Sequence, residues 1–112
     1  MLVIRLITAW LPIALGVVMI GTGVANFAGP PLALKNFAMW GYPAGFHRVA
    51  GGLGVVIGLL LVIPVTSLVG AIGSAIFMLA AVVTLIRSRD WGHLPGAAVL
   101  TAASVAAIAI QL

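Results

Sequence analysis

Residues 66–86 read TSLVGAIGSAIFMLAAVVTLI, a stretch without a charged side chain that ends directly before Arg87. Three further apolar stretches occupy residues 6–27, 46–63 and 95–112. Each is about 18 to 22 residues long, which at about 1.5 Å per residue matches a hydrocarbon core about 30 Å thick. The sequence therefore predicts four membrane crossings that use nearly the whole chain, in one domain of residues 1–112.

The composition also indicates a membrane protein. Hydrophobic residues make up 64% of the chain and charged residues 5%, whereas a soluble domain is about 25% charged. The mean hydropathy is +1.37. Because lipid offers the backbone no hydrogen-bond partners, spanning segments are helices or closed barrels, and barrel strands alternate polar and apolar residues. We therefore expect an all-α, integral membrane four-helix bundle of two helical hairpins, with helices at about 4–27, 46–63, 66–87 and 95–112.

A signal peptide is the alternative interpretation of the first stretch, because Arg5 precedes an apolar run. The run continues past Ile20 without an A-x-A-like cleavage site, whereas secretory apolar regions are about 7 to 15 residues long. We expect a transmembrane helix that Pro12 can bend but does not end. The chain has no cysteine, so thiol-based electron transfer and thiolate metal sites are excluded.

One long connection, residues 28–45, separates the first two predicted helices. Pro30 and Pro31 can start a short helix over about residues 31–40. This helix is short and apolar, and Lys35 can reach water from it, so we expect it to lie at the membrane interface.

A tryptophan-glycine-proline phrase occurs twice, as WGYPAG at residues 40–45 and WGHLPG at residues 91–96. Glycine permits the turn, and proline suits the approach to the next helix. Trp40 and Trp91 are predicted to be interfacial anchors, with the indole N–H toward water. Each phrase is interpreted as a turn by which the chain re-enters the membrane.

Basic residues predict the orientation. Lys35, Arg48, Arg87 and Arg89 flank connections 28–45 and 88–94, and the Pro64 turn has none. Lys and Arg accumulate on the cytoplasmic side. We expect a multi-pass protein of the cell membrane with these two connections in the cytoplasm and both termini outside, although Arg5 weakly favours the reverse.

Small residues at four-residue spacing predict close helix packing, because they let backbones approach in lipid. The predicted packing residues are Ala50, Gly54 and Gly58 in the second helix, Gly70 and Ser74 in the third, and Ala98, Ala102 and Ala106 in the fourth. The same faces would also suit a homo-oligomer.

A series of features between about residues 25 and 95 resembles the DoxX-like membrane proteins. The features are Asn26-Phe27, Lys35, Phe37, Gly41-Tyr42-Pro43, a second helix with Gly51-Gly52 that runs into Leu61-Val62-Ile63-Pro64, and a third helix that starts near Gly70 and ends at Arg87. The resemblance implies a four-helix membrane protein that is a subunit or accessory of a membrane redox complex, quinone-linked or acting in oxidative stress. Redox partner proteins and a quinone cofactor are implied in the same way.

One departure from the family pattern concerns a glutamate that many relatives carry early in the second helix. Residues 50–54 of this chain read AGGLG and contain no acid. A function that needs an intramembrane carboxylate is therefore in doubt.

Polar side chains gather at the predicted cytoplasmic side and form the candidate site for a ligand or head group. They are Lys35, Tyr42, His47, Arg48, Arg87, Arg89 and His93. Arginine supplies hydrogen-bond donors, and histidine titrates near neutral pH. We expect the short helix to cover a cavity with Arg48 and Arg87 at its mouth. The alternative is that these residues only bind lipid headgroups and fix the orientation.

Other functions fit the residues less well. Two histidines and one nearby carboxylate are too few for a metal site, and Asp90 is expected to form a weak surface ion pair with Arg89. A proton-coupled exporter needs a titratable group in mid-membrane, and the central helices have none. The basic residues are too dispersed for nucleic-acid binding, and no catalytic residue is assigned. A non-catalytic bundle that binds lipid or a small hydrophobic molecule remains the alternative to the redox role.

Overall fold

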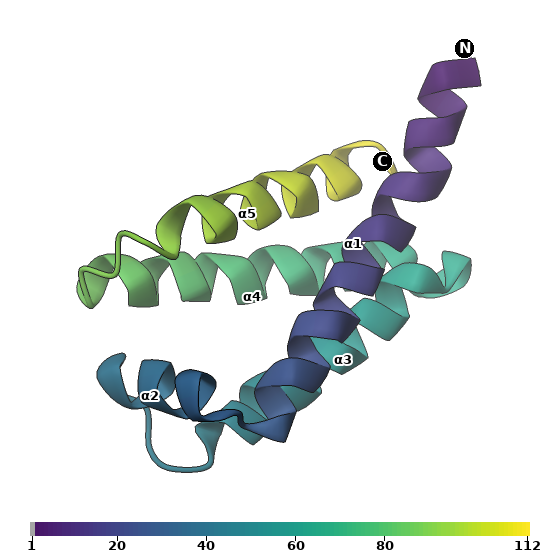
Figure 1. Cartoon of the computed structure of the whole chain (residues 1–112). Coiled ribbons are helices and arrows are strands. Elements are labelled where there is room, and N and C mark those ends of the chain that lie inside the picture. The colour runs from purple at the N-terminus through teal and green to yellow at the C-terminus, as the bar shows by residue number, and fades with distance from the viewer. Residues whose placement is uncertain (1) are drawn as a thin grey trace.

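The fold is helical throughout. The computed structural model describes residues 2–112, apart from the side chain of Ile7, and 84% of the chain is helix, with no strand among the described residues. The elements are α1 (Leu2–Ala28), α2 (Pro31–Met39), α3 (Phe46–Val62), the 3-10 turn η1 (Pro64–Thr66), α4 (Ser67–Arg87) and α5 (Leu94–Ala109) (Figure 1). The prediction of an all-α fold is confirmed.

The helix ends lie close to the predicted positions, with one clear difference. Helix α1 runs through Pro12 without a break, as expected. Helix α2 begins at Pro31, where a missing backbone N–H costs nothing. Helix α5 ends at Ala109 instead of continuing to residue 112. The last residues form a turn, and the side-chain amide of Gln111 donates to the carbonyl of Ala107 at 2.8 Å.

Helices α1 and α3 pack against each other through glycine. A Cβ on Gly23 would lie 2.7 Å from the carbonyl oxygen of Gly51, and a Cβ on Gly51 would lie 2.5 Å from that of Gly23. Gly16 and Gly58 form a second reciprocal pair, at 2.7 Å in both directions. Since these distances leave no room for a side chain, the two backbones are in direct contact.

Helices α4 and α5 form the second pair and share a buried polar contact. The hydroxyl groups of Ser74 and Ser104 lie 2.7 Å apart, and both residues have 0% exposure. Ser104 also donates to the carbonyl of Leu100 at 2.7 Å. Each hydroxyl therefore has a partner inside an otherwise apolar contact, which avoids the cost of burying an unpaired polar group.

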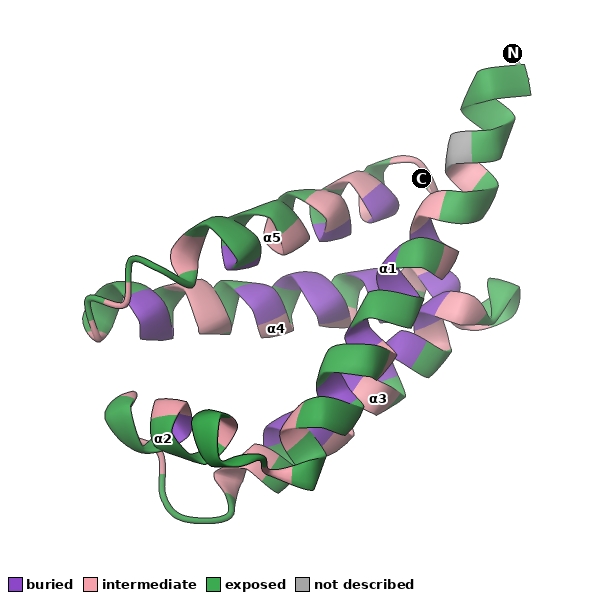
Figure 2. Cartoon of the chain, in the orientation of Figure 1, coloured by how far each residue is buried: buried purple, intermediate pink, exposed green. Residues whose placement is uncertain are grey.

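The two pairs join through α3 and α4, which are connected by η1 (Figure 1). The start of α4 lies against the end of α3, because a Cβ on Gly70 would be 2.6 Å from the backbone nitrogen of Leu61. Met19 and Leu61 fill the centre with 2% and 1% exposure. Buried residues line the inward faces of the helices, whereas the outward faces and the first turns of α1 are exposed (Figure 2).

The predicted packing residues fall on the inner faces of α3 and α4 but not of α5. Gly54, Gly58, Gly70 and Ser74 are buried, as is Ala50. On α5, Ala98 and Ala102 are exposed and Ala106 is half-buried. The buried face of α5 is instead formed by Ala97, Ser104 and Ala107.

Candidate functional site

An aromatic cluster attaches α2 and the connection after it to the start of α3. The ring of Phe37, which is buried, lies 5.2 Å from that of Trp40, 5.9 Å from that of Tyr42 and 6.1 Å from that of Phe46. Tyr42 and Phe46 stack with their ring centroids 4.3 Å apart and an interplanar angle of 7°. The ring contacts of this cluster, from Phe37 to Phe46, hold the connection between α2 and α3 against both helices, although few residues of that connection are helical.

Asp90, in the turn between α4 and α5, accepts hydrogen bonds from two sides. The indole nitrogen of Trp40 donates to its carboxylate at 2.9 Å, and Nδ1 of His93 lies 2.7 Å from the same oxygen. The guanidinium of Arg87 donates to the backbone carbonyl of Trp40 at 3.3 Å. Trp40, Arg87, Asp90 and His93 are called the Asp90 network below; it ties the end of α2 to the α4–α5 turn.

The hydrogen bond from Trp40 lowers the pKa of Asp90 below its usual value, and the hydrogen bond from His93 lowers it further. Burial acts in the opposite direction, since it disfavours the charged form. The Asp90 side chain is 11% exposed. An ionised carboxylate is thus held in a nearly enclosed position by donors from α2 and from the start of α5.

A second polar contact joins α4 to the segment after α2, about two helical turns before Asp90 in the sequence. The hydroxyl groups of Tyr42 and Thr84 lie 2.5 Å apart. Thr84 is buried and also donates to the carbonyl of Ala80 at 2.9 Å, so the Tyr42 hydroxyl is the donor between them. Two polar contacts, at Thr84 and at Asp90, thus connect α4 and its following turn to the segment around α2.

The remaining candidate residues do not belong to this network. His47 lies over Gly29, whose positive φ of 68° and missing side chain leave room for the imidazole. Lys35, Arg48 and Arg89 are exposed. From the predicted set, the structure therefore includes Tyr42, Arg87 and His93 in these hydrogen bonds and leaves the other four outside them.

Two sequence-based expectations at this site were wrong. Asp90 is hydrogen-bonded to His93 at 2.7 Å, and among the described residues it forms no such contact with Arg89. Arg89 has a φ of 56°, in the left-handed region, at the turn after α4. The indole N–H of Trp40 is bonded to Asp90 and does not point to water, whereas Trp91 is 58% exposed. The equivalent positions of the two phrases therefore have different environments.

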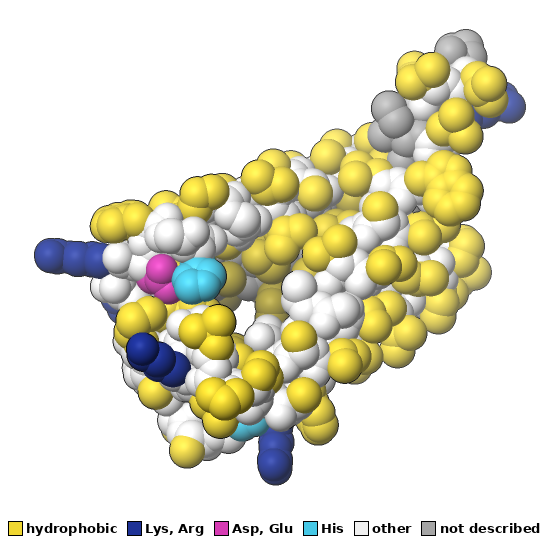
Figure 3. Space-filling view, viewed as in Figure 1, with side chains coloured by type: hydrophobic (Ala, Val, Ile, Leu, Met, Phe, Trp, Pro, Cys, Tyr) yellow, Lys and Arg dark blue, Asp and Glu magenta, His cyan; other side chains and the backbone are white. Residues whose placement is uncertain are grey.

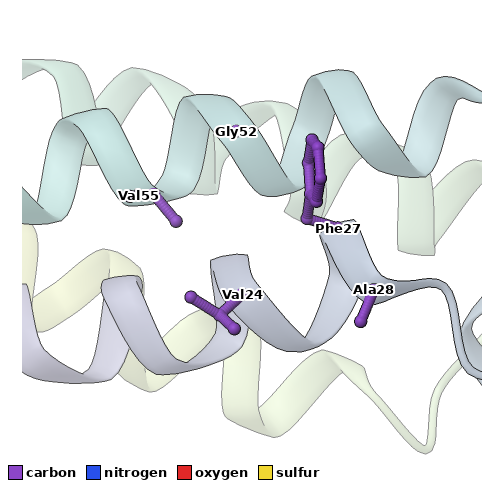
Figure 4. Close-up of a pocket in the computed structure, with 5 residues that line it drawn as sticks. All are labelled: Val24, Phe27, Ala28, Gly52 and Val55. Atoms are coloured by element: carbon purple, nitrogen blue, oxygen red, sulfur yellow. The ribbon is translucent and has the colours of Figure 1, made fainter.

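Open apolar grooves lie away from the Asp90 network. One of about 370 Å³ runs between α1 and α3 and is lined by Val24, Phe27, Ala28, Gly52 and Val55 (Figure 4). Another of about 380 Å³ lies near the start of α1, at Leu6, Trp10, Leu11 and Ala14. Neither lies beneath α2, and Arg48 and Arg87 line neither of them. Within residues 2–112, no three histidine or acidic side chains gather as metal ligands would.

A hollow opens between the α4–α5 pair and the α1–α3 pair in the face shown in Figure 3. Its visible walls are mainly hydrophobic, and the chain's single carboxylate, Asp90, lies at its edge with a histidine beside it. At this edge, the imidazole of His93 is hydrogen-bonded to the carboxylate of Asp90 and lies next to apolar surface.

The fold and this site define a small all-α protein with long apolar helices and a polar network at one end. A family model described as the DoxX-like family matches residues 10–107. The chain therefore belongs to the DoxX-like family, as the resemblance in the sequence implied. Comparison with curated proteins and with solved structures gives no match.

Proposed function

We propose that this DoxX-like chain is an integral membrane protein of the cell membrane, and the distribution of its exposed side chains supports this most directly. Large apolar residues are exposed on all four long helices, among them Val17 at 59%, Ile76 at 65% and Val99 at 66%. On the face in Figure 3, lysine and arginine lie only at the two ends, and hydrophobic side chains cover the region between them. A surface of this kind suits lipid and not water.

The lengths of the helices fit four crossings of unequal length. Two segments, Leu2–Ala28 and Pro64–Arg87, are long and apolar enough to cross a membrane. Helices α3 and α5 have 17 and 16 residues, which at about 1.5 Å per residue leaves them a few ångströms short of about 30 Å. A bilayer accommodates such a mismatch by local thinning or by flanking residues. In this proposal α1 with α3 and α4 with α5 are the two membrane hairpins.

We propose that the protein acts as a subunit or accessory of a membrane redox complex, quinone-linked or serving in oxidative stress. This is the role that the resemblance to the DoxX-like proteins implied, and the chain belongs to that family. The end of the bundle that carries Lys35, Arg48 and Arg89 offers exposed charge for redox partner proteins. Electron-carrying groups would belong to those partners, and this chain would hold them at the membrane.

A second candidate is a non-catalytic bundle that binds lipid or a small hydrophobic molecule. The groove between α1 and α3 favours it, because all five lining residues are apolar or glycine and Phe27 forms one wall (Figure 4). Ligand sites are typically apolar clefts with volumes of about 300 to 1,000 Å³.

Purification from native membranes in mild detergent distinguishes the two. For the redox role we expect partner proteins with a visible or flavin absorbance to co-purify, and quinone in the organic extract by mass spectrometry. Isolation of the chain alone, with stoichiometric lipid or another hydrophobic molecule, would refute the redox role and support the second candidate. Recovery of the chain in the supernatant after an alkaline carbonate wash would contradict membrane integration.

A further inference from the structure

We propose that His93, held by Asp90, binds the hydroxyl group of a lipophilic alcohol or phenol whose apolar part lies in the hollow between the two helix pairs. The inference rests on the second candidate function, the binding of a hydrophobic molecule, and names the chemical class of that molecule and the residue that recognises it.

The Asp90 contact fixes the proton on the His93 ring. Nδ1 is 2.7 Å from the carboxylate of Asp90, whose lowered pKa keeps it ionised at neutral pH. A carboxylate only accepts hydrogen bonds, so in the neutral imidazole Nδ1 carries the proton and Nε2 carries a lone pair. Among the described residues no side chain bonds to Nε2, and the His93 side chain is 53% exposed. The ring therefore offers one oriented acceptor.

The surroundings of this acceptor are shaped for an apolar molecule. The Trp40 ring stands edge-on to the His93 ring, with centroids 5.9 Å apart and an interplanar angle of 88°, and its N–H is already bonded to Asp90. Trp40 therefore contributes apolar ring surface next to the His93 ring. The hollow with hydrophobic walls begins at this edge (Figure 3), so a chain attached to the bound hydroxyl has apolar surface to contact.

The local charges favour a neutral hydroxyl. The carboxylate of Asp90 lies 2.7 Å from Nδ1 of His93, and its negative charge disfavours an anionic head group at the neutral imidazole. Arg87, which donates to the carbonyl of Trp40, disfavours a cation. A hydroxyl donates one hydrogen bond without bringing charge into a largely apolar place, which avoids the cost of burying an ion.

The test compares binding of 4-octylphenol with binding of 4-octylanisole, its methyl ether, to the purified full chain in detergent, by equilibrium dialysis. The ether keeps the apolar part and the ring but cannot donate a hydrogen bond. We expect the phenol to bind about five-fold more tightly, the value of one net hydrogen bond. His93→Phe should remove this preference, whereas His47→Phe, the matched change at the other histidine, should keep it.

A further measurement makes the result independent of folding defects. In the unmodified protein, the nitrogen resonance of His93 Nε2 should shift when the phenol binds and remain unchanged with the ether. Equal binding of the phenol and the ether, or an unchanged preference in His93→Phe, would overturn the role of His93 and leave the binding of hydrophobic molecules intact. Binding of neither probe would overturn the second candidate function as well.

Discussion

Trp40 and Asp90, fifty positions apart in the sequence, are joined by a hydrogen bond of 2.9 Å from the indole nitrogen to the carboxylate. Because Asp90 also contacts His93, the end of α2 and the start of α5 share one acceptor. The two tryptophan-glycine phrases therefore have different structural roles. Trp40 links the connection after α2 to the α4–α5 turn, whereas the side chain of Trp91 is 58% exposed.

Acid should weaken this connection. The folded protein holds the pKa of Asp90 below its ordinary value of 3.8, so the ionised carboxylate stabilises the fold above that pH. This stabilisation is lost as the pH falls from 3.8 through the lower pKa of the folded state. We expect the detergent unfolding temperature to drop in this window, together with a change in Trp40 fluorescence.

Asp90→Asn is the control for the acid transition, because an amide keeps an oxygen acceptor for Trp40 but does not titrate. Asp90 is the chain's single acidic side chain, and the charged or titratable side chains beside it in the Asp90 network are Arg87 and His93. The variant should show a much flatter pH profile. An identical transition in the variant would assign the acid effect to another group and refute the prediction.

Glycine contacts between α1 and α3 predict unequal effects of two neighbouring substitutions. A Cβ at position 51 would lie 2.5 Å from backbone atoms of Gly23 and Phe27, whereas one at position 52 would meet nothing within 4 Å. We expect Gly51→Ala to lower the free energy of unfolding by about 1 to 3 kcal/mol through overpacking. Gly52→Ala should be neutral or stabilise by up to about 1 kcal/mol, since alanine favours helix.

Reversible unfolding in mixed detergent measures both variants on the same helix. Equal stability of the two would mean that α1 and α3 do not approach as closely as their backbones indicate.

The fold class and the approximate helix ends could be predicted because hydropathy is a local property: each apolar stretch, such as residues 66–86, is visible without knowing its neighbours. The Asp90 network could not be predicted, since it depends on where two distant connections meet. Nearest neighbours in the sequence suggested an Asp90–Arg89 pair, but the left-handed backbone at Arg89 forms part of a turn in which Asp90 meets His93.

The spacing of small residues also did not predict which face of α5 is buried. Alanine occurs at positions 97, 98, 102, 103, 106, 107 and 109, so four-residue spacing fits more than one face. The position of Ser104 was the better signal, because a hydroxyl in an apolar helix needs a partner, and it lies opposite Ser74. Ser104 and Ala107 share the buried face that the Ala98 and Ala102 pattern missed.

The Ser74–Ser104 contact should show energetic coupling. Each of Ser74→Ala and Ser104→Ala removes a buried hydrogen bond of 2.7 Å, and we expect each to cost about 1 kcal/mol. The double variant should cost less than the sum by about 0.5 to 1 kcal/mol, because the second change removes a group already without its partner. Thr101→Ala serves as the control, since Thr101 donates only to the carbonyl of Ala97 within its own helix.

A thermodynamic cycle of detergent unfolding free energies measures the coupling. Strict additivity of Ser74→Ala and Ser104→Ala would show that the two helices do not meet at this position in the membrane.

The orientation in the membrane is the last prediction. Lys35, Arg48, Arg87 and Arg89 belong to the segments at the end of the bundle that holds α2 and the α4–α5 turn, whereas Arg5 belongs to the first turns of α1 at the other end (Figure 1). Basic side chains near short connections stay in the cytoplasm, so connections 28–45 and 88–94 should be cytoplasmic and both termini outside.

Alkaline phosphatase, which is active only outside the cytoplasm, tests this when fused after Leu112 and, separately, within connection 88–94. We expect activity from the first fusion alone. Replacing Arg87 and Arg89 by glutamine removes half of the four basic residues at the predicted cytoplasmic end, and should lower that activity as part of the population inserts in the opposite orientation. An even number of crossings keeps both termini on one side of the membrane in either orientation. Activity from the 88–94 fusion alone would therefore mean that the orientation is the opposite of the predicted one, with the four helices retained. Activity from both fusions in the unmodified chain would contradict four crossings with one fixed orientation.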